Sequence, residues 1–222
     1  MPDRLSVAVP ETYQHGAFSV AAIPTGERWG AICYVVRDAS SGEAVIVDPG
    51  GASSAIRAAV AGLGASVRGV LLTHAHHDHV GAAAEVAAHF GVRCHIHSAD
   101  FKLLRKAATY SVAFGGRPFP PVTDPVALDA EGSTFAFGPL RIVHTPGHTP
   151  GSCSFFFPGF VFTGDTLLHR EVGRTDLPGS DRAALVASVD EIMRLASDDD
   201  ILYGGHPRPW RAGEARRWWA ER

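Results

Sequence analysis

The sequence predicts an α/β protein built from layers of sheet and helix. Short apolar segments such as 69–73 and 160–163 have the length and composition of buried strands. Longer segments such as 53–63 and 181–196 carry their apolar residues at helical spacing. Because strands and helices alternate along most of the chain, the helices are expected to cover the sheets. This alternation is compatible with either a four-layer sandwich or a doubly wound sheet.

Length, charge and hydropathy narrow the class of protein further. A chain of 222 residues with 45% hydrophobic and 19% charged residues can bury a sizeable core, and we expect one domain over residues 1–222. The net charge of −3, without a long basic run, argues against a nucleic-acid partner. No run of 18 apolar residues predicts a membrane span, and residues 1–10 lack the pattern of a signal peptide. We therefore expect a cytoplasmic enzyme that acts on a small molecule, with homo-oligomerisation left open.

The first half of the chain reads as strands followed by a helix. Strands are expected at 18–23, 30–37 and 44–48, and a helix at 53–63 that Gly64 ends. Segment 69–73 reads as a strand buried on both faces, followed by an Ala-rich helix over 80–90 that ends at Gly91. The three cysteines, Cys33, Cys94 and Cys153, all fall in expected strands. Their odd number favours buried free thiols over a disulfide framework.

The second half continues the alternation. A strand is expected at 92–97 and a helix at 98–106, before the Gly/Pro-rich stretch 114–121. An amphipathic helix over 181–196 presents an apolar face, and Ser180 is its expected cap. A short helix is expected at 213–222, where Trp218 and Trp219 suit core or interface contacts. The remaining expected strands are 140–144, 152–157, 160–163 and 200–203.

A dense cluster of metal-binding side chains follows strand 69–73. His74, His76, Asp78 and His79 lie within six positions, and imidazole and carboxylate are ligands that zinc-like cations prefer. In an extended segment, residues two apart point the same way, so His74 and His76 can share one ion. The turn into the following helix directs Asp78 and His79 toward a second position. An alternative role for Asp78 is the N-cap of that helix.

Three further candidate ligands each follow a strand and a glycine. His148 comes after strand 140–144 and Gly147, Asp165 after strand 160–163 and Gly164, and His206 after strand 200–203 and Gly205. Glycine lets the backbone turn sharply and approach a bound ion. Each residue alone reads as an ordinary loop residue, but the repeated pattern indicates one shared site.

These motifs resemble those of the metallo-β-lactamase superfamily from about residue 18 to about residue 217. The segment 73–81 (THAHHDHVG) is similar to the superfamily signature, and later segments follow in the same order. The segment 173–179 (GRTDLPG) is similar to the branch of glyoxalase II-like hydrolases and persulfide dioxygenases. The other similar segments are 48–51 (DPGG), 145–152 (TPGHTPGS), 162–167 (FTGDTL) and 205–206 (GH).

The resemblance implies an αββα four-layer sandwich, with two mixed β-sheets flanked by helices, and a centre of two divalent metal ions. His74, His76 and His148 would hold the first ion, and Asp78, His79 and His206 the second. Asp165 would bridge the two ions. Zinc is the expected metal, although iron or manganese suits the same donors.

Such a centre favours hydrolysis. Two cations sharing a water lower its pKa, so a metal-bridging hydroxide can attack the carbonyl of a small thioester at neutral pH. The same cations stabilise the negative charge that develops on the carbonyl oxygen. Asp78 is the expected catalytic residue, since its carboxylate can hold the hydroxide's proton by a hydrogen bond.

Three basic residues are candidate substrate contacts. Lys102 and Arg117 lie in segment 98–133, whose apolar and basic side chains would either cover the metal cleft or form a surface connection. Arg174 could also meet an anionic substrate such as a glutathione conjugate. Its proximity to Asp176 in a tight turn favours a local structural pair instead.

Two departures argue against strict glutathione-thioester specificity. Only 16 residues follow His206, which leaves no room for the C-terminal helical region of glyoxalase II, and the segment 205–208 reads GHPR instead of the usual GHGP. A mononuclear iron persulfide dioxygenase, using His74, His148 and Asp165, is therefore an alternative. A ring-opening lactonase or β-lactamase is another. A purely structural metal site is disfavoured, because such sites favour cysteine and no cysteine lies in these motifs.

Overall fold

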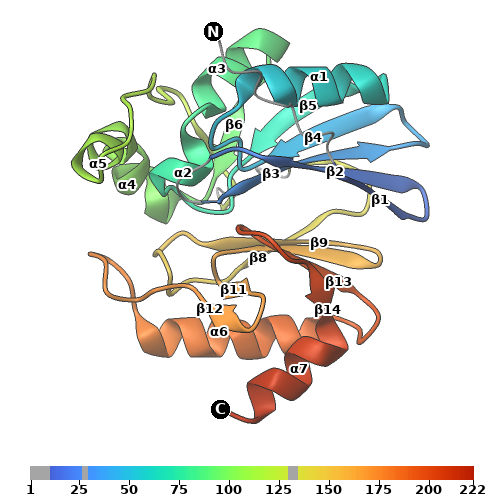
Figure 1. Ribbon diagram of the computed structural model, residues 1–222, viewed down its shortest axis with the longest axis vertical. Helices are drawn as coiled ribbons and strands as arrows, with labels where there is room; N and C mark the ends of the chain where they lie inside the picture. The colour runs from blue at the N-terminus through green and yellow to red at the C-terminus, as the bar shows by residue number, and fades with distance from the viewer. Residues whose placement is uncertain (1–10, 27–29, 130–134) are drawn as a thin grey trace, which may run out of the picture.

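Two mixed β-sheets face each other, and helices cover the outer face of each sheet (Figure 1). The computed structural model describes residues 11–26, 30–129 and 135–222. Residues 1–10, where no signal peptide is predicted, lie outside the described residues, as does the end of segment 98–133. The layering is the αββα sandwich that the resemblance implies.

The first sheet has seven strands in the order in which they occur in the chain. Strands β1 to β4 are antiparallel neighbours, whereas β5, β6 and β7 each add in parallel. Helices α1 (Ser53–Leu63) and α3 (Ala83–Phe90) cover its outer face (Figure 1). The strands are β1 (Glu11–His15), β2 (Phe18–Pro24), β3 (Ile32–Asp38), β4 (Glu43–Val47), β5 (Ser66–Leu71), β6 (Cys94–Ile96) and β7 (Val126–Ala127).

The second sheet has five strands in the order β14-β13-β10-β9-β8, in which only the β10–β13 pair is parallel. Helices α6 (Arg182–Leu195) and α7 (Ala212–Ala220) pack beneath it (Figure 1). A separate hairpin joins β11 (Leu167–Leu168) and β12 (Glu171–Val172). The strands are β8 (Arg141–His144), β9 (Cys153–Phe157), β10 (Phe160–Gly164), β13 (Ile201–Gly204) and β14 (Trp210–Arg211).

Three hydrophobic cores follow from the alternation of side chains along the strands. In β3, Cys33 and Val35 face α1 and α3, whereas Tyr34 and Val36 face the second sheet. In β9, Phe155 and Phe157 join the core between the sheets, and Phe156 points outward to α6 and α7. Strands buried on both faces are therefore mostly apolar. The strand expected at 69–73 is β5 (Ser66–Leu71), which begins and ends earlier and is buried on both faces at residues 69–71.

The predicted helix over 80–90 is two helices. The helix α2 (His77–Val80) begins earlier, and α3 starts after a break at Gly81 and Ala82. The break arises from the loop 48–51: the Ala82 amide donates to the Pro49 carbonyl at 2.8 Å, and a Cβ at Gly81 would lie 2.4 Å from the Gly50 oxygen. The N-cap of α2 is His76, so Asp78 lies within the first turn and is not the cap.

Other boundaries also differ from the prediction, and the strand expected at 92–97 is the shorter β6. The helix expected over 98–106 is a 3₁₀ turn, η1 (Ser98–Asp100), then α4 (Phe101–Leu104) and α5 (Ala107–Ala113). Helix α6 is capped by Asp181, whose Oδ1 accepts from the amides of Ala183 and Ala184, because the Ser180 hydroxyl donates to the Leu177 carbonyl instead. A carboxylate that accepts two orphan amides is the stronger cap.

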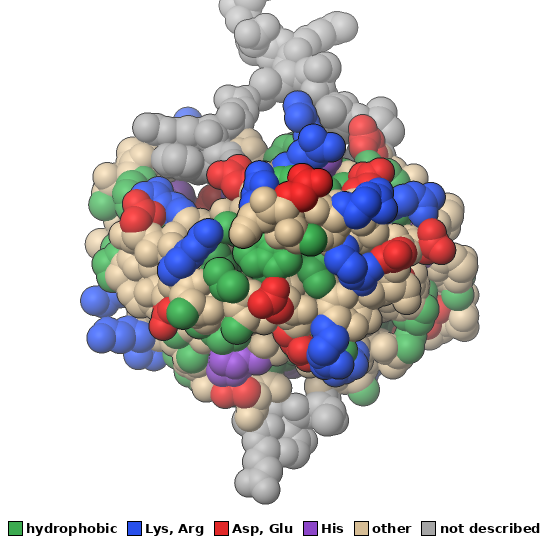
Figure 2. Space-filling view, turned by 90° about the horizontal axis from the view of Figure 1, so that it is seen from below, with side chains coloured by type: hydrophobic (Ala, Val, Ile, Leu, Met, Phe, Trp, Pro, Cys, Tyr) green, Lys and Arg blue, Asp and Glu red, His purple; other side chains and the backbone are tan. Residues whose placement is uncertain are grey.

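The cysteines, the helices and the charged surface residues can be compared with the expectations from the sequence. Cys33, Cys94 and Cys153 are buried free thiols, as predicted. Over the part of the chain that the structure describes, no helix is long and apolar enough to cross a membrane. On the face seen from below, Lys and Arg side chains are intermixed with Asp and Glu around a hydrophobic area (Figure 2).

Candidate metal centre

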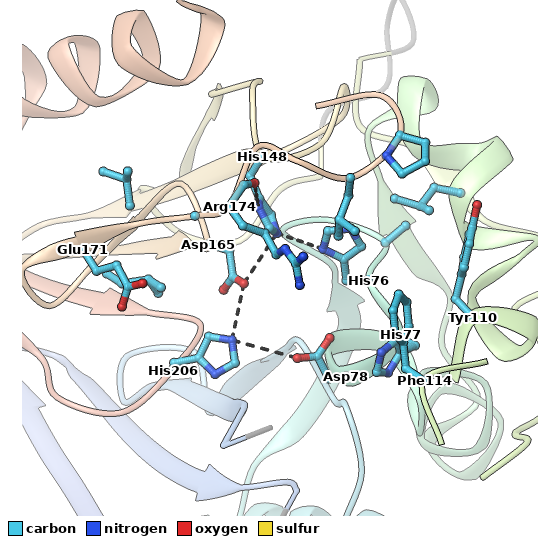
Figure 3. A pocket seen from close by; sticks show the side chains of 17 residues that line it. His76, His77, Asp78, Tyr110, Phe114, His148, Asp165, Glu171, Arg174 and His206 are labelled. Atoms are coloured by element: carbon cyan, nitrogen blue, oxygen red, sulfur yellow. Dashed lines mark hydrogen bonds and ion pairs between the residues drawn. The ribbon is translucent and has the colours of Figure 1, made fainter. Parts of the chain in front are cut away.

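The seven candidate ligands converge from four loops that follow strands of both sheets. His74, His76, Asp78 and His79 follow β5, whereas His148 follows β8, Asp165 follows β10 and His206 follows β13. Figure 3 shows the five of them that line the cleft, His76, Asp78, His148, Asp165 and His206, with their side chains pointing toward one another. The loops at this end of the sandwich therefore bring together residues up to 132 positions apart in the sequence (206 − 74).

The side chains form two sets of three with one carboxylate between them. His74, His76 and His148 place their nitrogens within 4.8 Å of one another, and so do the ligand atoms of Asp78, His79 and His206. These are the two sets expected from the sequence, and each has the donors to hold one cation.

Asp165 lies between the two sets. Its Oδ2 is 3.5 Å from His148 Nε2 in the first set and 3.3 Å from His206 Nε2 in the second. Its Oδ1 is 3.5 Å from His79 Nε2. This carboxylate can therefore reach both cation positions.

Hydrogen bonds from neighbouring residues orient the buried imidazoles. Nδ1 of His79 contacts Asp48 Oδ2 at 3.1 Å, and Nδ1 of His148 contacts the Arg174 carbonyl at 2.9 Å. Nδ1 of His74 contacts the Thr73 hydroxyl, which itself donates to Asp48. Because these acceptors occupy Nδ1, each ring presents Nε2 to the centre.

Asp48 acts as a support and not as a ligand. It lies close enough to His74 and His79 to form a third possible set. Its two oxygens, however, already accept from the Thr73 amide, the Thr73 hydroxyl and His79.

The donor set fits a pair of cations. Nε2 of His74, Nε2 of His79 and Oδ1 of Asp165 are buried without a hydrogen-bond partner among the described residues. Buried polar atoms are almost always paired, so three such atoms among the candidate ligands fit residues that bind cations. Glycine also keeps this space open, because a Cβ at Gly205 would lie 2.3 Å from Asp165 Oδ1 and 2.5 Å from His79 Cε1.

The surroundings lower the pKa values of three candidate ligands, His74, His76 and Asp165. Burial, followed by His79, lowers the pKa of His74 well below its usual value. Burial and then His148 lower the pKa of His76. Burial opposes ionisation of Asp165, but the neighbouring imidazoles, His79 first, outweigh it and lower its pKa. Neutral imidazoles and an ionised carboxylate are the states that metal ligation requires.

The pKa of His79 is shifted in the opposite direction from those of His74 and His76. Burial opposes its charge, but Asp165 and Asp78 outweigh this effect and raise its pKa to about 10. This raised pKa shows that the carboxylates of Asp165 and Asp78 favour positive charge at the second donor set.

Asp100 is a site residue that the sequence analysis did not identify. It is completely buried at the end of η1 and accepts hydrogen bonds from two loops that carry candidate ligands. One donor is the Ala75 amide, between His74 and His76, at 2.9 Å. The others are the Thr149 hydroxyl at 2.8 Å and the Gly151 amide at 2.7 Å, next to His148. Nothing in the residues around position 100 signalled this role, because its partners are distant in the sequence.

A cleft of about 400 Å³ opens beside the centre. Candidate ligands form its floor, and its walls come from α4 and α5 on one side and from β11, β12 and the loop after β12 on the other (Figure 3). The wall residues are mainly apolar and comprise Leu103, Tyr110, Phe114, Leu168, Glu171, Val172, Gly173, Arg174, Leu177 and Pro178. The end of α5 therefore borders the cleft, as the covering role considered for segment 98–133 requires.

Of the three predicted substrate contacts, Arg174 alone lines the cleft. Its guanidinium forms a two-point ion pair with Asp176, with atoms 2.6 and 2.7 Å apart. Lys102 on α4 and Arg117 after α5 are exposed and do not line it.

An αββα sandwich with a two-cation donor set at its loop end defines a class of metal-binding protein. The chain matches the model of the metallo-beta-lactamase superfamily over residues 27–206. This protein belongs to that superfamily.

The chain is similar in sequence to proteins of about its own length. An uncharacterized protein of Mycobacterium tuberculosis is 35% identical over 83% of this chain and 89% of its own length. The hydroxyacylglutathione hydrolase GloC of Haemophilus influenzae is 32% identical over 78% of this chain and 84% of its own.

Solved structures share the architecture. The B3 metallo-beta-lactamase BLEG-1 has a TM-score of 0.79 and 31% identity, covering 89% of this chain and 96% of its own. TTHA1623 in a di-iron-bound form has a TM-score of 0.72 and 32% identity, covering 93% of this chain and 96% of its own.

Proposed function

We propose that this protein is a metal-dependent hydrolase that holds two divalent ions and cleaves a small thioester. The observation that carries the proposal is the convergence of two three-residue donor sets on Asp165, next to a cleft. The first ion would lie among His74, His76 and His148. The second would lie among Asp78, His79 and His206, with Asp165 between the two.

The metals and the chain would divide the chemistry between them. Two bound cations would lower the pKa of a shared water and polarise the acyl carbonyl. Asp78 lines the cleft and faces His206 Nε2 at 3.9 Å, so its carboxylate can accept a hydrogen bond from the attacking water and orient it. Tyr110 and Phe114 form an aromatic wall that excludes bulk water from one side of the acyl group.

Similarity to GloC supports a thioester as the substrate, and the cleft volume suits a small acyl compound. The same nitrogen and oxygen donors suit zinc, iron or manganese. We expect zinc, and metal analysis of the purified protein decides between these ions.

Replacing His76 tests the centre directly. We expect His76→Ala to lose at least one of two metal ions per chain and to lower kcat/KM for thioesters by about 100-fold or more, because the first donor set loses one of its three nitrogens. His89→Ala, at an exposed position of α3, is the matched control. Full metal content and turnover in His76→Ala would show that the ligand assignment is wrong.

A substrate panel separates the possible reactions. S-lactoylglutathione, glutathione persulfide, an acyl-homoserine lactone and a cephalosporin are offered to the metal-loaded enzyme. Thioester cleavage with two ions per chain supports the proposal. One iron per chain with oxygen consumption on the persulfide alone would identify a dioxygenase instead, and activity confined to a ring substrate would identify a lactonase or β-lactamase.

A further inference from the structure

We propose that the cleft selects thioesters whose thiol half carries a positive charge, and that Glu171 is the residue that recognises this charge. The inference rests on the thioesterase activity proposed above and adds the substrate class for that site. It is based on which of the charged side chains that line the cleft already form ion pairs.

Four carboxylate or guanidinium side chains line the cleft. Asp78 and Asp165 belong to the candidate metal centre, which leaves Glu171 and Arg174 to meet the rest of a substrate. These two residues come from β12 and from the loop that follows it.

Arg174 is already neutralised. Its Nε and Nη2 donate to the two carboxylate oxygens of Asp176 at 2.6 and 2.7 Å, which is the two-point geometry of a strong charged pair. The pair lowers the pKa of Asp176 to about 2, so both partners are charged at neutral pH. Asp176 therefore offsets the charge of this guanidinium, although Nη1 keeps its own N–H donors.

Glu171 is not neutralised. Its carboxylate has no ion pair or hydrogen bond with any residue in the described parts of the chain. Arg170 and Arg182 line a second cavity on which Glu171 also borders, yet neither lies within ion-pair distance of it. Leu168 and Val172 form the apolar part of the cleft wall next to Glu171, and Glu171 itself is exposed to solvent at the edge of the cleft.

The position of Glu171 assigns it to one half of the substrate. Figure 3 places Glu171 on one side of the cleft and Tyr110 and Phe114 on the other, with Asp165, His206 and Asp78 between them. A thioester whose carbonyl lies over the centre extends to both sides. The aromatic wall suits an apolar acyl chain, so the thiol half reaches toward Glu171.

Three thioesters with one acyl group test the proposal. Butyrylthiocholine carries a quaternary ammonium, the butyryl ester of 2-mercaptoethanol is neutral, and that of 3-mercaptopropionate is anionic. Thiol release by the metal-loaded enzyme gives kcat/KM for each. We expect Glu171→Gln to lower kcat/KM for the cationic thioester by about fivefold, to leave the neutral one within about twofold, and to raise it for the anionic one. Glu171→Lys should reverse the order.

The matched control is Glu214→Gln, at an exposed position of α7 outside the lining of the cleft. Equal responses of the three thioesters to Glu171→Gln, with all three hydrolysed, would overturn the inference and leave the proposed thioesterase intact. Failure to hydrolyse any of the three while S-lactoylglutathione is cleaved would overturn the inference alone, whereas failure on all four thioesters would overturn both. Retained butyrylthiocholine preference in Glu171→Lys would also exclude Glu171 as its source.

Discussion

At the scale of single residues, Asp100 joins the two loops that carry the first donor set. Its oxygens hold the backbone on either side of this set, through Ala75 in one loop and Gly151 in the other. Burial raises the pKa of Asp100, against the lowering effect of its three hydrogen bonds. A carboxylate can accept all three donors at once, whereas an amide of the same shape has only one acceptor oxygen.

The variant Asp100→Asn is therefore expected to leave at least one buried donor without an acceptor. We expect it to lower the free energy of unfolding by about 1–3 kcal/mol and to weaken metal binding by about 10–100-fold. Urea unfolding and competition with a chelator measure the two effects. Asp199→Asn, with 98% of its side chain exposed, is the control. Unchanged metal affinity in Asp100→Asn would show that the hydrogen bonds do not position the centre.

At the scale of elements, helix α2 depends on the loop 48–51. This four-residue helix carries Asp78 and His79, and it is too short to be stable without neighbours. The loop lies directly against it, because a Cβ at Gly50 would lie 1.5 Å from the Asp78 carbonyl oxygen. Only glycine permits this approach at position 50.

Gly50→Ala is expected to displace α2 and to weaken the second donor set more than the first. Overpacking of this kind costs about 1–3 kcal/mol in stability. Metal content per chain should fall toward one ion, and thioester turnover should fall with it. Gly62→Ala in α1, where a Cβ meets nothing within 4 Å, should be neutral or stabilising. Two tightly bound ions in Gly50→Ala would contradict this account of α2.

At the scale of the whole molecule, the candidate centre spans the two halves of the sandwich. Four of the seven residues follow β5 of the first sheet, and the other three follow β8, β10 and β13 of the second. Cations that bind only when both halves are in place stabilise the whole fold by mass action.

Removal of metal is therefore expected to lower the stability of the entire chain. A cation present at a hundredfold excess over its Kd contributes about 3 kcal/mol, which corresponds to a Tm lower by roughly 10 °C after EDTA treatment. Calorimetry before EDTA, after EDTA and after zinc is restored measures the shift. The shift should be smaller in His76→Ala. A Tm that is unchanged while metal is released would separate the centre from global stability.

Local sequence patterns were sufficient to predict the α/β class and a shared site for the donors, whereas the four-layer sandwich was predicted from the resemblance to the metallo-β-lactamase superfamily. The spacing of His74 to His79, and the glycines before His148, Asp165 and His206, appear in the sequence itself. The α/β class follows from short, mostly apolar strands that alternate with amphipathic helices along most of the chain.

Long-range contacts account for what the sequence did not predict. The break at Gly81 is caused by the loop 48–51, and the role of Asp100 depends on residues 25 and 51 positions away. The substrate contacts expected of Lys102 and Arg117 were inferred from their charge and their place in segment 98–133, and neither residue lines the cleft. Such contacts leave no local periodic pattern.

The division of the donors between two sheets also has a consequence for biosynthesis. On the ribosome, His74 to His79 emerge well before His148, Asp165 and His206. A nascent chain therefore presents only four of the seven candidate ligands until its second sheet has been translated and has docked. We therefore expect metal to bind at the last stage of maturation, and only to chains whose two halves have already assembled.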